Sequence, residues 1–197
     1  MTGEGPGEHE LHRETQGAVL VEFLIAFLPV LTAFLCLCQI ALLFAVKLAV
    51  DGAAVNAART AAVVIGDDPK NYSGNVEPLH QFQKPNGARF QAVETAARLS
   101  LGAFIADGTI MSVDVLFPAS NDPGGKERKS ASFAPMNNSD IDKVRVRVEA
   151  RALCKIGLAN QIACGGLLGQ FFFNPVPTRV VRAEAVYPYQ GASYTYP

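Results

Sequence analysis

The residue with the clearest chemical requirement in this sequence is Glu22, because it stands at the start of a long apolar stretch. From Phe23 to Val46 the chain has 24 residues without a charge, and only Thr32 and Gln39 among them are polar. A carboxylate at mid-membrane depth costs about 2.5–3.5 kcal/mol on insertion scales. Since no Lys or Arg lies within the stretch, Glu22 needs a cationic partner from outside this helix.

Cleavage of the peptide bond after Gly17 would create such a cation. Ala18 would then carry a free α-ammonium group four residues before Glu22. A neighbouring copy, shifted along the helix axis, could place this amine against the carboxylate, so that the two charges neutralise each other within a helix bundle. The alternative is an ordinary signal anchor in which Glu22 lies at the membrane interface and its side chain reaches the headgroups.

The four cysteines fall into two pairs. Cys36 and Cys38 lie within the apolar stretch, and we interpret them as packing residues that face lipid or neighbouring helices. Cys154 and Cys164 flank a short loop, which predicts a disulfide in an oxidising compartment, with free buried thiols as the alternative.

The sequence contains no common catalytic pattern, neither HExxH, GxSxG, CxxC nor a phosphate-binding glycine loop. We therefore expect no enzymatic activity, no metal and no cofactor. The formal net charge of −1 lacks the basic footprint of a nucleic-acid-binding protein, so we expect no nucleic-acid partner.

The apolar stretch is long enough to cross a bilayer, whose hydrocarbon core needs about 20 apolar residues. We expect a transmembrane segment at about residues 23–46, within one continuous helix over residues 18–65 that Pro29 bends. Residues 1–17 are polar and rich in Gly and Glu, and they predict a leader without regular structure. Gly66 and Pro69 predict the end of the helix.

Residues 66–197 predict a small α+β domain, into which the long N-terminal transmembrane helix extends. A second helix over Ala88–Ile105 is expected to pack on a three-stranded antiparallel sheet. A long loop, residues 118–142, lies between the first two strands of this sheet. On the middle strand, Arg145, Arg147 and Arg151 predict a solvated face. The three strands are expected at Thr109–Phe117, Lys143–Leu153 and Val176–Tyr187.

The start of the helix resembles a known signal. Gly17, four apolar residues and then Glu22-Phe23 before a long apolar run are similar to the class III signal of type IV pilin-like proteins. Pro29 and the Ala57-Ala58-Arg59 element that follows narrow the resemblance to the TadE-like minor pseudopilins of Tad (tight adherence, Flp-type) pilus systems. The strand around residues 181–184 is also similar. One departure is Ala18, where the family has an aromatic residue or Met first.

This resemblance implies a substrate of a prepilin peptidase, which cuts after Gly17, and a function in the assembly or priming of a type IV pilus. It implies that the leader, residues 1–17, is cytoplasmic, that the helix spans the bacterial inner membrane once, and that residues 66–197 are periplasmic. The expected partners are other pilins or pseudopilins and inner-membrane platform proteins, which the N-terminal helix would contact. The residues expected in helix packing are Pro29, Gln39, Ala57, Ala58 and Arg59.

Two other functions stay open at this point. One is a membrane-anchored periplasmic adaptor of other envelope or secretion machinery, in which Glu22 has no special role. The other is an adhesin-like pilus tip subunit, in which Phe171–Phe173 or the 118–142 loop forms the binding surface.

Overall fold

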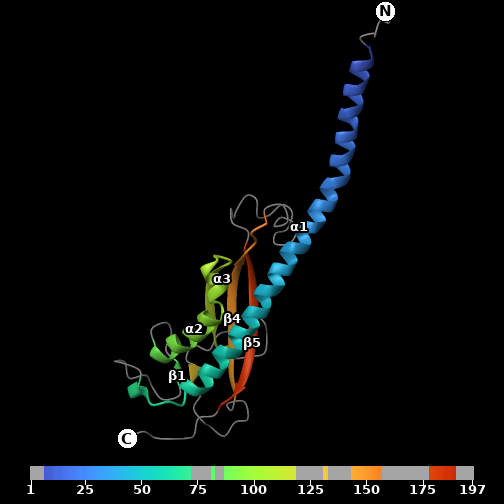
Figure 1. Ribbon diagram of the computed structural model, residues 1–197. Coiled ribbons are helices and arrows are strands. Elements are labelled where there is room, and N and C mark those ends of the chain that lie inside the picture. The colour runs from blue at the N-terminus through green and yellow to red at the C-terminus, as the bar shows by residue number, and fades with distance from the viewer. Residues whose placement is uncertain are drawn as a thin grey trace, which may run out of the picture.

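The computed structural model describes residues 7–71, 81–82, 87–118, 131–132, 143–156 and 178–189. It has the expected α+β architecture, with one long helix, two shorter helices and a three-stranded antiparallel sheet (Figure 1). The elements are α1 (Gly7–Val64), the 3-10 turn η1 (Pro69–Asn71), β1 (Gln81–Phe82), α2 (Ala88–Ser100), α3 (Gly102–Ala106), β2 (Ile110–Leu116), β3 (Ala131–Ser132), β4 (Lys143–Leu153) and β5 (Thr178–Pro188).

Helix α1 confirms the expected continuous helix and is longer than expected at its N-terminal end. It begins at Gly7 rather than at residue 18 and contains 58 residues. The expectation of an irregular leader was therefore wrong for residues 7–17, while residues 1–6 lie outside the described part. The physical reason is that each residue added to an existing helix gains a hydrogen bond at little cost, and Glu, Leu and Arg of this segment are good helix formers.

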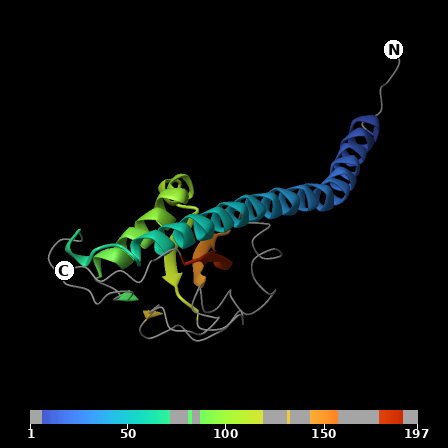
Figure 2. The same ribbon diagram turned by 90° about the horizontal axis from the view of Figure 1, so that it is seen from below.

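The N-terminal part of α1 is bent away from the rest of the helix (Figure 2). Pro29 lies inside the helix and cannot donate the backbone hydrogen bond to residue 25, and its ring crowds the preceding turn. Thr32 Oγ1 donates to the Leu28 carbonyl at 2.8 Å, a contact that also favours bending. This hydrogen bond satisfies the hydroxyl within the helix itself.

At its C-terminal end α1 tightens over three residues and then stops. The Ile65 N–H still donates to the Ala61 carbonyl at 3.1 Å, whereas the Gly66 N–H donates to Val63 at 3.3 Å. The fully buried Arg89 donates from Nη2 to the Asp67 carbonyl at 2.6 Å. A cation at a helix C-terminus is favourable because the last carbonyls carry partial negative charge. Arg89 therefore joins the start of α2 to the end of α1.

The sheet has the strand order β2-β4-β5, and both pairs are antiparallel. The bounds of β4 are those expected, because its strict alternation of Val or Ala with charged residues is a strong strand signal. Strands β2 and β5 are confirmed with ends that differ by one or two residues. Two additional short strands, β1 and β3, pair with each other. Strand β3 falls within the loop expected at 118–142.

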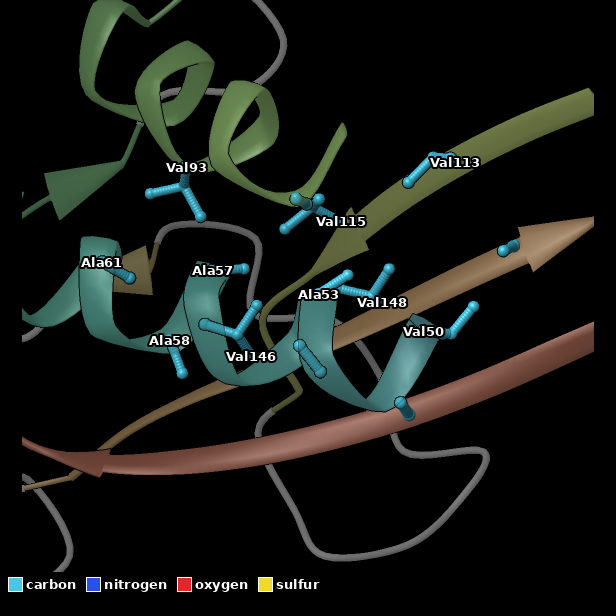
Figure 3. Close-up of a cluster of buried hydrophobic side chains, with 14 of the residues drawn as sticks. Val50, Ala53, Ala57, Ala58, Ala61, Val93, Val113, Val115, Val146 and Val148 are labelled. Atoms are coloured by element: carbon cyan, nitrogen blue, oxygen red, sulfur yellow. The ribbon is translucent and has the colours of Figure 1, made fainter. Parts of the chain in front are cut away.

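The core lies where the second half of α1 crosses the sheet (Figure 3). Alanine has only one methyl group in its side chain, so the helix backbone can lie close to β4 and β5. Opposite these alanines stand valines of the sheet, among them Val146 and Val148, which are fully buried. The alanines of α1 that are no more than 2% exposed are Ala53, Ala54, Ala57, Ala58, Ala61 and Ala62.

The second helix packs differently from the expectation. Because α1 already covers β4 and β5, α2 packs mainly along α1 and contacts the sheet at β2. The expected single helix 88–105 is also divided into α2 and α3. The division is at Leu101, whose φ of −101° and ψ of 4° depart from helical values. Leu101 is fully buried, and Gly102 after it is a poor helix former.

The face of the sheet that points away from α1 is less exposed than the arginines of β4 had led us to expect. Arg151 is exposed as expected, but Arg147 is only 4% exposed. Glu184 lies directly opposite Arg147 on β5, and its Oε2 accepts from Arg147 Nε at 3.1 Å and Nη2 at 2.9 Å. Arg145 Nε lies 3.2 Å from Glu184 Oε1. The expectation of a solvated face was wrong for Arg147 because a cross-strand carboxylate neutralises it.

Close packing of α1 on the sheet predicts that Ala57 tolerates no larger side chain. The Ala57→Leu variant should lose about 1–3 kcal/mol of unfolding free energy, because the added carbons force neighbouring side chains to shift. Chemical denaturation of the full chain in detergent micelles measures this loss. Ala45→Leu is the matched control, since Ala45 is exposed on the same helix. Equal stability of the two variants would contradict the described packing.

Candidate functional site

The residues of the expected processing site all lie within α1. Gly17, Ala18 and Glu22 belong to one unbroken helical segment, and Ala18 and Glu22 are four residues apart, so they share a face. Glu22 is exposed and has no ion-pair partner among the residues that the structure describes. Phe23 stacks on Phe27, with ring centroids 5.3 Å apart and an interplanar angle of 13°. The structure therefore presents a carboxylate on an otherwise apolar helical surface.

This apolar surface extends over the N-terminal part of α1. Within the described part of the chain, α1 is the one helix long and apolar enough to cross a membrane by length and composition. Its most apolar 18-residue window has a mean hydropathy of 2.5, and none of that window is buried. The large apolar side chains between 40% and 70% exposed include Val19, Leu20, Phe23, Ile25, Leu28, Val30, Phe34 and Leu37.

From Ala18 onward, the first buried residue of α1 is Gln39, which is 1% exposed and begins the part of the helix that has one face packed on the domain. Its Oε1 accepts a hydrogen bond from the Ile156 backbone N–H at 3.1 Å, a contact between residues 117 positions apart. From there Val46 and Val50 continue into the core. The segment expected to span the membrane, residues 23–46, therefore overlaps at its end with the part of α1 that is packed on the domain.

The remaining residues expected in helix packing lie in the domain. Ala57 and Ala58 are fully buried against this chain's own sheet. Arg59 is exposed, and its guanidinium carbon lies 5.9 Å from the centre of the Tyr187 ring, a cation–π geometry. Of the five packing candidates, Pro29 alone belongs to the exposed apolar part.

The backbone segment that contacts Gln39 directly follows β4, and two contacts hold it in place. Cys154 is buried and disulfide-bonded, while Cys36 and Cys38 are free thiols. Cys164, the partner expected from the sequence, lies outside the described residues, so this pairing stays a prediction. Next to Cys154, Lys155 Nζ donates to Asp107 Oδ2 at 2.6 Å and to the Asp107 carbonyl at 2.9 Å.

The charge of Lys155 affects the acidity of its partner. Hydrogen bonds from Lys155 and Thr109 and the charge of Lys155 together hold the pKa of the Asp107 carboxyl below its ordinary value of 3.8. The contact joins the turn before β2 to the end of β4, and Gly108 allows this turn with a φ of 70°. It positions the backbone that leads to Ile156.

No group of three or more His, Cys, Asp or Glu side chains that could hold a metal ion occurs among the described residues. Comparison of the chain with protein-family models, with curated proteins and with solved structures finds no match.

Two contacts of α1, one at Gln39 and one just beyond its C-terminal end, carry no local sequence signal. Ile156 uses its backbone N–H, so its side-chain type does not predict the hydrogen bond to Gln39. Arg89 stands in the first turn of an amphipathic helix, where a charged residue is ordinarily exposed. Only its position beside the end of α1 shows why it is buried.

The hydrogen bond of Gln39 predicts a specific effect of its removal. Gln39→Leu keeps the side-chain size but leaves the Ile156 N–H without this acceptor, so the domain should lose about 1–3 kcal/mol. Hydrogen exchange at the Ile156 amide should become faster. Gln91→Leu, at an exposed position of α2, is the control and should change stability by less than about 0.5 kcal/mol. Unchanged exchange in Gln39→Leu would contradict the contact.

The Lys155–Asp107 contact predicts a dependence on pH. Lys155→Met should raise the pKa of Asp107 toward 3.8, which an NMR titration of the carboxyl carbon measures. Because the folded pKa is lowered, the contact stabilises the fold above the pKa of the unfolded chain, and this contribution is lost as the pH falls through the lowered value. Lys143→Met, at the other end of β4, should leave the Asp107 titration unchanged, and an effect as large as that of Lys155→Met would refute the assignment.

Proposed function

We propose that this chain is a TadE-like minor pseudopilin of a Tad-type type IV pilus system, processed by a prepilin peptidase after Gly17. It acts in assembly or priming of the pilus through helix–helix packing and does no chemistry of its own. The observation that carries the proposal is Glu22, an exposed carboxylate on an apolar helical surface without a partner among the described residues. The resemblance of the Gly17–Phe23 segment supports it.

The proposal treats the exposed part of α1 as a single membrane span. Residues 18–38, which precede the first buried residue, extend about 31 Å at 1.5 Å per residue. This length matches a hydrocarbon core of about 30 Å. The span is therefore shifted toward the N-terminus of the interval 23–46 and includes Glu22 near its cytoplasmic end. The domain is then periplasmic, as in the family that the sequence resembles.

Processing changes the charge at the start of the span. Gly17 weakens the helix by about 1 kcal/mol relative to alanine, which favours local opening for the peptidase. The new Ala18 ammonium and the first free N–H groups of the helix are both positive, and an adjacent carboxylate stabilises them. A neighbouring pilin or pseudopilin could supply the complementary group to Glu22. Inside a membrane such a pair is favoured because neither charge has water to solvate it.

The domain is joined to this span without a linker, because the same helix supplies both. The second half of α1 forms the centre of the core, so displacement of the span toward a partner moves the whole domain. This is a suitable arrangement for a subunit that a platform protein positions by its membrane helix.

The test combines processing with assembly. When the full chain is coexpressed with the prepilin peptidase, mass spectrometry should find a mature form that starts at Ala18, and Gly17→Leu should abolish it. Glu22→Gln should still be processed but should fail to support pilus assembly, because the carboxylate is lost while the helix is kept. Phe27→Leu, on the same exposed surface, is the control and should preserve assembly.

Two outcomes distinguish the proposal from other functions. An intact N-terminus in the presence of active peptidase excludes a pseudopilin. Normal assembly or function with Glu22→Gln favours the alternative of an anchored adaptor in other envelope or secretion machinery. The adhesin-like alternative depends on residues 118–142 and Phe171–Phe173, most of which lie outside the described residues.

A further inference from the structure

An open cleft of about 450 Å³ lies where α1 leaves the exposed apolar segment and meets the edge of the sheet. One wall is a single stripe of α1, with Ile40, Leu43, Phe44 and Lys47 at the spacing of one helical face. The other wall is residues 179–182 at the start of β5. The cleft thus begins two residues after the end of the proposed membrane span. The position of the cleft and the chemistry of its lining together indicate the class of molecule that it binds.

The lining of the cleft combines apolar and basic side chains. On α1 the apolar Ile40 and Phe44 are 42% and 66% exposed, and Lys47 follows two turns after Ile40. On β5 the exposed Val180 lies beside Arg182. Three of the eight lining residues are basic and none is acidic. This combination is complementary to a molecule with an anionic head and an apolar body.

The basic side chains of the cleft are ordered by contacts that leave them accessible. Lys47 Nζ pairs with Asp51 and donates to the Arg182 carbonyl at 2.8 Å, and Arg182 Nε pairs with Glu149 at 2.9 Å. The Lys47 and Arg182 side chains are 43% and 55% exposed. Exposed ion pairs contribute little stability, so both cations can also bind an anion at low cost.

We propose that this cleft binds the headgroup of an anionic phospholipid of the membrane in which α1 is anchored. The phosphate lies between Lys47 and Arg182, and the glycerol and upper acyl carbons lie against Ile40, Phe44 and Val180. The long stems of Lys and Arg extend along the apolar wall and bring their charges to the phosphate level. Basic residues next to a membrane span attract anionic lipids by about 1 kcal/mol each, or about fivefold in binding.

This inference rests on the proposed membrane anchor and specifies how the domain is held at the membrane surface. A lipid bound on both α1 and β5 restrains the angle between the domain and the bilayer. The bound lipid also covers the outer edge of β5 at the point where Lys47 already satisfies the Arg182 carbonyl.

The experiment uses the full chain in nanodiscs that contain equal amounts of phosphatidylglycerol and phosphatidylcholine. Native mass spectrometry of the released protein should show preferential retention of phosphatidylglycerol. The Lys47→Gln/Arg182→Gln variant should lower this preference roughly 25-fold, because each of the two basic side chains contributes about fivefold. Lys47→Arg/Arg182→Lys should keep it, because the charges are kept. Arg98→Gln/Lys143→Gln is the charge-matched control away from the cleft and should also keep it.

A second measurement does not depend on the folding of the variants. Phosphatidylglycerol with a photoreactive group near the glycerol should label wild-type peptides that contain Phe44 and Val180. Flotation of the full chain with lipid vesicles of the same composition reports the anchor independently. A chain that floats but retains both lipids equally, or is labelled elsewhere, overturns the cleft while the anchor stands. A chain that does not float overturns both.

Discussion

The rest of the structure depends on one constraint, which is that a single helix must satisfy two surroundings. Over residues 18–38 the side chains of α1, except Glu22 and Thr32, are apolar, and none is buried by the domain, whereas from Gln39 onward one face is packed against the domain. The two parts of α1 therefore differ in the size of their side chains. The first has large apolar side chains on all faces, and the second has alanines that bring the helix close to β4 and β5. Apolar surface of the first kind is unfavourable in water, so it requires lipid or other helices.

This division explains the positions of the polar residues of α1. Gln39 marks the change of surroundings, and its side chain accepts the Ile156 N–H rather than remaining unpaired. Lys47 follows two turns later and satisfies a carbonyl at the edge of the sheet. Glu22 is the exception, because no residue in the described part of the chain forms an ion pair with it. In the proposed function its partner comes from processing and assembly, which explains why a costly residue stands in an apolar span.

The sequence was sufficient for the elements whose patterns are local. Strict alternation placed β4, and the Gly66–Pro69 segment placed the end of α1 within one residue. The sequence was insufficient where a structural feature depends on contact with a residue far away in the sequence. Alanine is compatible with any helical face, so the pattern did not show that α1 rather than α2 covers β4 and β5. Arg147 alternated as an exposed residue should, and only Glu184 on the neighbouring strand explains its burial. The extension of α1 to Gly7 reflects helix propagation from the apolar segment, whereas the polar residues 7–17 have no apolar periodicity that indicates a helix.

The central claim of the proposed function is that the hydrocarbon core of the membrane ends at Gln39, where the part of α1 that packs on the domain begins. Thiol labelling in sealed vesicles tests it directly, because Cys36 and Cys38 are natural probes on one side of this boundary. A membrane-impermeant maleimide should not modify them until detergent is added. A cysteine introduced by Leu48→Cys, at a position 71% exposed, should react at once from the side of the domain. Rapid labelling of Cys36 and Cys38 in intact vesicles, or protection of position 48, would contradict the account.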